Sequence, residues 1–416
     1  MSVLPSGEIK ALTGLRIVAA VWVVLFHFRP LFWEAAPGFS SALSPVLDRG
    51  AQGVDLFFIL SGFVLTWNYL EKMGRTWSTR ATIRFLWLRL ARVWPVYLVT
   101  LHLAAALVIF TIYVGHVPPE STAEFNAVSY LRQLFLVQLW FQPYFDFSSW
   151  NGPAWSISAE WLAYLLFGGL ILVVFRVARA TRARSLLVLA MAASLPPVVL
   201  LLASGQFYSP WSWLPRIVMQ FTAGALACAA VRKLRPGDRT RYAAGAASLL
   251  LVAAVVGALY YFDAHPNPRI TDAGGLVDLL FMPLVVTLAI GAGTLPRLLS
   301  TRVMVYLGQV SFGLYMVHEI VHNAWIWATK QFELTLTGPM GIVMLLGLLA
   351  VALGIACLIY HLVEEPARHW MRRMVDVRGV APAPREAPAK DTATAGRLQN
   401  LGDHESRSES RPARAG

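Results

Sequence analysis

Long runs of apolar residues, separated by short polar segments, recur along most of the chain. Each run is about 20 residues long or somewhat longer, the length that a helix needs to cross about 30 Å of hydrocarbon at about 1.5 Å per residue. The pattern therefore predicts an all-α integral membrane protein with about ten transmembrane helices. These predicted spans are residues 12–28, 52–70, 93–115, 155–175, 185–203, 214–231, 242–262, 276–295, 303–329 and 339–363.

The composition supports the membrane assignment. Of the 416 residues, 57% are hydrophobic and 14% are charged, which is more apolar surface than one soluble core can bury. In a soluble protein the net charge of +12 would suggest a nucleic-acid partner. Here the arginines lie in short segments between apolar runs, so we expect no nucleic acid and interpret them as signals of orientation in the lipid bilayer.

The distribution of lysine and arginine predicts that both termini are cytoplasmic. With a cytoplasmic N-terminus, the internal loops hold several times more of these residues than the external loops, which follows the positive-inside rule and favours an even number of crossings. We expect a cytoplasmic N-terminus at 1–11 and a transmembrane domain at 12–363. Residues 364–416 are rich in Pro, Ala, Arg and Ser and are expected to form a cytoplasmic, mostly disordered tail.

Ionisable residues inside the spans are few, and such residues commonly face a cavity or a partner. Arg16 and His27 lie 11 residues apart in the first span, which places them on one helix face, about 16 Å apart along the axis. Arg16 would lie near the cytosolic side and His27 toward the other, so this face could serve a cytosolic donor and a distal acceptor. The alternative is an interfacial anchor and a histidine satisfied by packing.

A second candidate lies before the third span. Arg89 and Arg92 are neighbours at i and i+3 on the cytoplasmic side, where two guanidinium groups can bind phosphate oxygens bidentately. The alternative is that they are ordinary positive-inside arginines.

Six motifs occur in order along the chain: LTGLRIVAAVWVVLFHF, GVDLFFILSGFVL, RLARVWPVYLV, WSISAEWLAYLLF, SFGLYMVHEIV and VEEPARHW. Together they resemble the acyltransferase-3 family of multi-pass membrane O-acyltransferases. The resemblance implies a cytosolic acyl-CoA donor, most often acetyl-CoA, with no tightly bound cofactor. It also implies a carbohydrate-type hydroxyl acceptor at or beyond the opposite face of a plasma membrane, here expected to be bacterial.

By position, the family's arginine and histidine of the first span correspond to Arg16 and His27. Its paired arginines correspond to Arg89 and Arg92. The family usually has an acidic residue and a glycine around the first arginine, where this chain has Thr13 and Ile17, so a possible partner of that arginine is missing.

The residue types suggest a mechanism. Histidine, with an unperturbed pKa of about 6.5, can take the hydroxyl proton at neutral pH, so His27 is the candidate base. It could instead carry the acyl group as an acyl-imidazole. Arg89 and Arg92 would bind the donor phosphates, and Arg16 would stabilise phosphate or oxyanion charge. Second-tier candidates within the family motifs are Asp55, Ser61, Glu160 and His318.

The sequence also allows other acceptors and other classes of function. The acceptor is expected to be a cell-envelope or exported polysaccharide, with a glycosylated natural product such as a macrolide as the alternative. Intramembrane charges also fit a transporter or flippase of an acylated or glycosylated lipid. Residues 318–322 read HEIVH, a zinc-protease pattern, but the family motif already accounts for His318 and we expect no metal.

Overall fold

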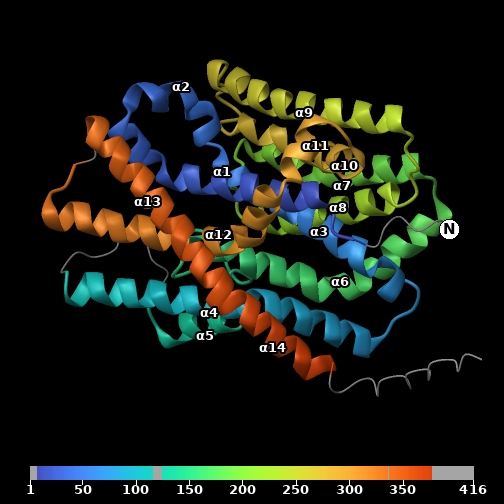
Figure 1. The fold of residues 1–416 in the computed structure, drawn as a ribbon, viewed down its shortest axis with the longest axis horizontal. Helices are drawn as coiled ribbons and strands as arrows, with labels where there is room; N and C mark the ends of the chain where they lie inside the picture. Colours follow the sequence, from blue (N-terminus) through green and yellow to red (C-terminus); the bar gives the residue numbers. More distant parts are fainter. Residues whose placement is uncertain (1–6, 116–123, 336, 377–416) are drawn as a thin grey trace, which may run out of the picture. The chain divides into compact units, whose positions relative to one another are not determined.

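A computed structural model describes residues 7–115, 124–335 and 337–376. The regular elements of these residues are all helical, which confirms the predicted all-α class (Figure 1). The α-helices are α1 (Lys10–Ala35), α2 (Pro37–Leu47), α3 (Gly53–Met73), α4 (Thr79–Tyr113), α5 (Ala127–Leu134), α6 (Trp155–Ala180), α7 (Ala183–Ser204), α8 (Trp213–Val231), α9 (Asp238–Ala264), α10 (Phe281–Ile290), α11 (Thr294–Leu299), α12 (Arg302–Phe332), α13 (Gly338–Ile359) and α14 (Glu365–Asp376).

Nine helical segments within the described residues are long and apolar enough to cross a membrane. They are Lys10–Ala35, Pro37–Met73, Thr79–Tyr113, Gly152–Ala180, Ala183–Ser204, Trp213–Val231, Asp238–Ala264, Ala273–Ile290 and Gly338–Val375. The predicted span 303–329 forms α12, a helix of 31 residues, but is not among the nine. Polar residues such as His318, Glu319 and His322 interrupt its apolar sequence, and they contact other helices instead of lipid.

Helices α1, α3 and α12 position the candidate site. Helix α1 packs against α12, α3 and α13, and α3 packs against α8. Two glycines allow the last contact, because a Cβ atom at Gly62 would overlap the carbonyl oxygen of Phe221 and one at Gly224 would overlap that of Ile59. Small residues allow membrane helices to approach this closely. Gly62 therefore fixes the position of its neighbour Ser61.

The helical region continues past the predicted boundary at residue 363. A π-helical turn, Tyr360–Glu364, joins α13 to α14, and α14 reaches Asp376. The indole Nε1 of Trp87 on α4 donates a hydrogen bond of 2.8 Å to the carbonyl oxygen of Met371, so α14 is held against α4 at this residue. The start of the expected tail is thus ordered by packing, and residues 377–416 lie outside the described residues. Residues up to Arg372 pack into one unit.

Candidate active site

A histidine on α1 lies against a glutamate on α12. The Nδ1 atom of His27 is 2.9 Å from Oε2 of Glu319, and the side chains are 28% and 16% exposed. At this N···O distance the carboxylate forms an ion pair with the ring once the ring takes up a proton, and in partly buried surroundings such a pair is only weakly screened. Glu319 is therefore placed to stabilise positive charge that develops on His27.

Two further histidines surround this pair. The ring of His318 is fully buried and its centroid is 5.0 Å from that of His27. Nδ1 of His322 lies 3.6 Å from the same Glu319 oxygen that faces His27. The carboxylate is thus placed between two imidazoles from different helices.

The positions of these side chains can be compared with those of a zinc site of the H-E-x-x-H type. His27, His318 and Glu319 each offer one ligand atom, all within 4.8 Å of one another, so these three groups could hold a metal ion. The HEIVH pattern instead requires His318 and His322 as ligands, with the glutamate free to activate water. In the structure the glutamate pairs with His27, which is not the arrangement of an H-E-x-x-H zinc site.

Residues 151–153, which precede α6, are hydrogen-bonded to α12 beside the cluster. The side-chain amide of Asn151 donates a hydrogen bond of 2.8 Å to the carbonyl oxygen of Met316, and the Tyr315 hydroxyl donates one of 2.9 Å to that of Pro153. Between them, a Cβ atom at Gly152 would lie 3.7 Å from Cγ of Glu319. The backbone at residue 152 therefore forms a wall against the glutamate side chain.

Two second-tier candidates meet each other. The hydroxyl of Ser61 on α3 donates a short hydrogen bond to Oε1 of Glu160 on α6. Glu160 also attracts Arg16, whose guanidinium carbon is 5.8 Å from the centroid of the Phe57 ring. A carboxylate from another helix thus acts on Arg16.

Asp55, another second-tier candidate, pairs with an arginine. It forms a bidentate ion pair with Arg216 on α8, with distances of 2.9 Å to Nε and 2.5 Å to Nη2. Both side chains are almost fully buried, and Arg216 also lies over the rings of Phe207 and Tyr208. Asp55 neutralises a buried arginine instead of orienting an imidazole.

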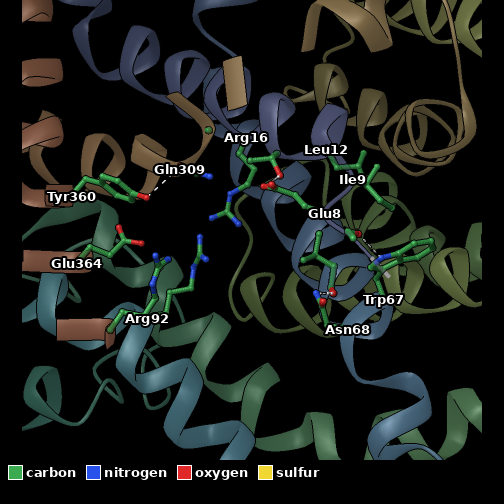
Figure 2. Close-up of a pocket in the computed structure, with 15 residues that line it drawn as sticks. Glu8, Ile9, Leu12, Arg16, Trp67, Asn68, Arg92, Gln309, Tyr360 and Glu364 are labelled. Carbon is green, nitrogen blue, oxygen red and sulfur yellow. Dashed lines mark hydrogen bonds between the residues drawn. The ribbon is translucent and has the colours of Figure 1, made fainter. Parts of the chain in front are cut away.

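A polar cavity of about 320 Å³ lies at the end of α1 that carries Arg16. Figure 2 shows the side chains of Arg16 and Arg92 directed toward one another across this space, with Glu364 and Tyr360 beside them. Arg368 of α14 and Gln309 of α12 also line the cavity. Cations from α1, α4 and α14 thus converge on one volume.

The two arginines predicted to act together are separated. Arg92 lines the cavity, but Arg89 does not. The guanidinium carbon of Arg89 lies 5.9 Å from the ring centroids of both Tyr69 and Phe85. A spacing of i and i+3 leaves about 60° between two side chains around a helix, which here is enough to direct them to different neighbours.

Sequence reasoning did not single out Glu319 as a partner of His27, nor Glu364, Arg368 or Arg216. Glu319 stands next to His318 in one family motif, and Glu364 and Arg368 belong to the last motif. Their position within these motifs is the feature of the sequence that could have identified them as site residues. Arg216 lies outside the six motifs and gave no comparable signal.

Comparison with known proteins decides the family. Residues 9–361 match the acyltransferase-3 family model, described as an acyltransferase domain. The chain belongs to this family. It is therefore a multi-pass membrane acyltransferase, as the motifs predicted.

Two bacterial proteins are similar to the chain, and one of them is named as an acyltransferase. Acyltransferase MdmB of Streptomyces mycarofaciens is 28% identical over 410 residues, covering 93% of this chain and 97% of that protein. Protein 2 in picA locus of Rhizobium radiobacter is 32% identical over 217 residues, covering 50% of this chain and all of that protein. No solved structure matches the chain.

Proposed function

We propose that this acyltransferase moves an acyl group, most often acetyl, from cytosolic acyl-CoA to a hydroxyl group of a carbohydrate-type acceptor. The observation that supports this proposal most directly is the distance of 2.9 Å between Nδ1 of His27 and Oε2 of Glu319. His27 also shares one face of α1 with Arg16, which lines the polar cavity. A base, a carboxylate that stabilises its protonated form and a cationic donor cavity are the parts that this reaction needs.

His27 acts as the general base in this mechanism. The acceptor oxygen bonds to the thioester carbonyl carbon while its proton passes to the imidazole, and Glu319 stabilises the imidazolium that forms. The carbon–sulfur bond then breaks, and the proton passes from His27 to the thiolate sulfur of coenzyme A. In the alternative route His27 takes the acyl group itself, and the acceptor then attacks the acyl-imidazole.

The donor phosphates bind in the polar cavity. Arg92 supplies a guanidinium fork to the phosphate oxygens, and Arg16 stabilises phosphate or oxyanion charge between the cavity and His27. The thioester lies at the end of the long pantetheine chain of coenzyme A. The phosphates can therefore stay at Arg92 while the acyl carbon reaches His27, about 16 Å along α1 from Arg16.

The acceptor is a polysaccharide of the cell envelope or one destined for export. The bacterial relatives support a bacterial plasma membrane as the location. Acceptors of this kind lie on the side of the membrane opposite the acyl-CoA pool. A base on a membrane-spanning helix, far along that helix from the donor cavity, suits such a transfer.

Transfer of radiolabelled acetyl from acetyl-CoA tests the proposal. Membranes that contain the full chain are incubated with polysaccharide, glycolipid and glycosylated small molecules, including a macrolide, and each product class is analysed separately. Label in a glycan supports the proposed acceptor, whereas label only in the small glycosides replaces it with the natural-product alternative. Label that stays on the protein when no acceptor is present identifies the acyl-imidazole route.

A second arm addresses transport. Vesicles containing the full chain are supplied with an acylated glycolipid, and its movement between leaflets is followed without acyl-CoA. Movement of the lipid together with no consumption of any acyl-CoA would overturn the proposed donor and acceptor.

A further inference from the structure

The π-helical turn between α13 and α14 places three residues on the polar cavity. Tyr360, Glu364 and Arg368 follow one another at intervals of four residues, and all three line the cavity. Insertion of a π-turn into a helix is rare and is often found at functional sites. Tyr360 is fixed by donating a hydrogen bond of 3.3 Å to Oε1 of Gln309 on α12.

The charges around the cavity are not matched by ion pairs. Among the described residues, neither Arg16, Arg92 nor Arg368 has a carboxylate oxygen within ion-pair distance. The Nε atoms of Arg16 and Arg368 are buried and make no hydrogen bond within that part of the chain. Burying guanidinium nitrogens without a partner is costly, so these two arginines, together with the partly buried Arg92, fit an anionic ligand in this volume.

Glu364 lies among these cations. Its side chain is 1% exposed, and neither carboxylate oxygen has a hydrogen-bond partner in the described residues. It interacts electrostatically with Arg92, Arg368 and Arg16, while the two arginines Arg16 and Arg92 repel each other. One carboxylate therefore limits the repulsion among three guanidinium groups and leaves a net positive lining. The other lining carboxylate, Glu8, accepts a hydrogen bond from Thr13.

We propose that Arg368 is the third phosphate-binding arginine of the donor site and that Glu364 is a positioning residue for the three cations. This inference rests on the proposed function, because the phosphates are those of the acyl-CoA nucleotide. Coenzyme A carries a pyrophosphate and a separate ribose phosphate, and guanidinium groups from α1, α4 and α14 can engage these groups from different directions. The last motif of the chain thus belongs to the donor site.

Binding of coenzyme A to the purified full chain tests this role. The protein is placed in phosphatidylcholine nanodiscs, and titration calorimetry gives the Kd for wild type, Arg368→Ala, Arg368→Lys and Arg372→Ala. Arg372 lies on the same helix, is exposed and does not line the cavity, so its variant is the matched control. We expect Arg368→Ala to weaken binding about tenfold or more, Arg368→Lys to restore part of the affinity, and the control to bind like wild type.

A second series identifies the phosphate that Arg368 contacts. Loss of the difference between wild type and Arg368→Ala when dephospho-CoA replaces coenzyme A assigns Arg368 to the ribose phosphate. Persistence of the difference assigns it to the pyrophosphate. Glu364→Gln is expected to weaken coenzyme A binding in wild type and to have a smaller effect in Arg368→Ala, because both residues then act through the same cations.

The remaining outcomes count against the proposal. Coenzyme A binding that is equal in wild type and Arg368→Ala would overturn the role of Arg368 and leave the proposed function standing. No coenzyme A binding by wild type would instead remove the proposed donor. In nanodiscs that contain phosphatidylglycerol, lipid retention that depends on Arg368 while coenzyme A affinity does not would assign the arginine to a lipid headgroup.

Discussion

Glu319 of α12 lies 2.9 Å from Nδ1 of His27 of α1, so the histidine that the motif of the first span predicts has a carboxylate partner from the last part of the bundle. Because reaction at a neutral imidazole makes it positive, a fixed negative charge at this distance lowers the barrier. The pair gives His27 a chemical environment that the first span alone does not supply.

Glu319→Gln is expected to lower kcat for acyl transfer about 100-fold with little change in the KM for acyl-CoA. The amide keeps the shape of the side chain but removes the charge that stabilises imidazolium. Steady-state kinetics with acetyl-CoA measure both constants. Glu333→Gln, at the exposed end of the same helix, is the control and should resemble wild type. A fully active Glu319→Gln enzyme would show that the carboxylate has no part in catalysis.

The close approach of the Gly152 backbone to Glu319 predicts that a larger side chain at residue 152 disturbs the contact between Glu319 and His27. Gly152→Ala should be tolerated, because the added Cβ would make an ordinary contact of 3.7 Å with Glu319. Gly152→Leu should displace the carboxylate from His27 and lower kcat about 10- to 100-fold. Gly169→Leu is the matched control, since no atom lies within 4 Å of a Cβ there. Equal activity of the two leucine variants would contradict the positioning role of this segment.

Arg92 and Arg89 are expected to behave differently although both belong to one motif. Arg92→Ala should raise the KM for acyl-CoA about tenfold or more, because Arg92 lines the donor cavity. Arg89→Ala should leave this KM unchanged and lower the melting temperature, since Arg89 packs over Tyr69 and Phe85. Steady-state kinetics give the KM for acyl-CoA of both variants, and thermal unfolding gives their melting temperatures. Equal increases in KM would restore the arginines as a phosphate-binding pair.

Asp55 is expected to matter for stability. Asp55→Asn leaves Arg216 buried without its counter-charge, which should cost about 3–5 kcal/mol in the free energy of unfolding. Asp55→Asn combined with Arg216→Met should recover much of the loss, because no buried charge then remains unpaired. Thermal unfolding in one detergent compares these variants with Asp48→Asn, whose ion pair with Arg29 is largely exposed. A double variant as unstable as the single one would contradict this assignment.

The sequence predicted those features that depend on neighbouring residues in the chain. Apolar runs located the helices because span length and hydropathy are local properties, and a helical spacing of 11 residues placed Arg16 and His27 on one face. Partners on other helices depend on tertiary packing instead. The contacts of His27 with Glu319, of Asp55 with Arg216 and of Ser61 with Glu160 each join distant parts of the chain.

Tertiary packing also adds detail to two predictions that rest on local sequence. The composition of residues 364–376 resembles a disordered tail, yet Met371 within this segment is buried and its carbonyl oxygen accepts a hydrogen bond from Trp87 of α4. The grouping of Arg89 with Arg92 followed from their spacing, but aromatic neighbours from α3 and α4 draw Arg89 away from the cavity. Neither effect could be derived from the local pattern.

The most direct test of the central claim is transfer of labelled acetyl from acetyl-CoA by membranes containing wild type, His27→Ala or His102→Ala. His102 is a histidine of α4 outside the His27 cluster and is exposed with its ring near Tyr130. Transfer by wild type and His102→Ala, with a loss of about 100-fold or more in His27→Ala at equal protein level, is the predicted result. Undiminished transfer by His27→Ala would contradict the account.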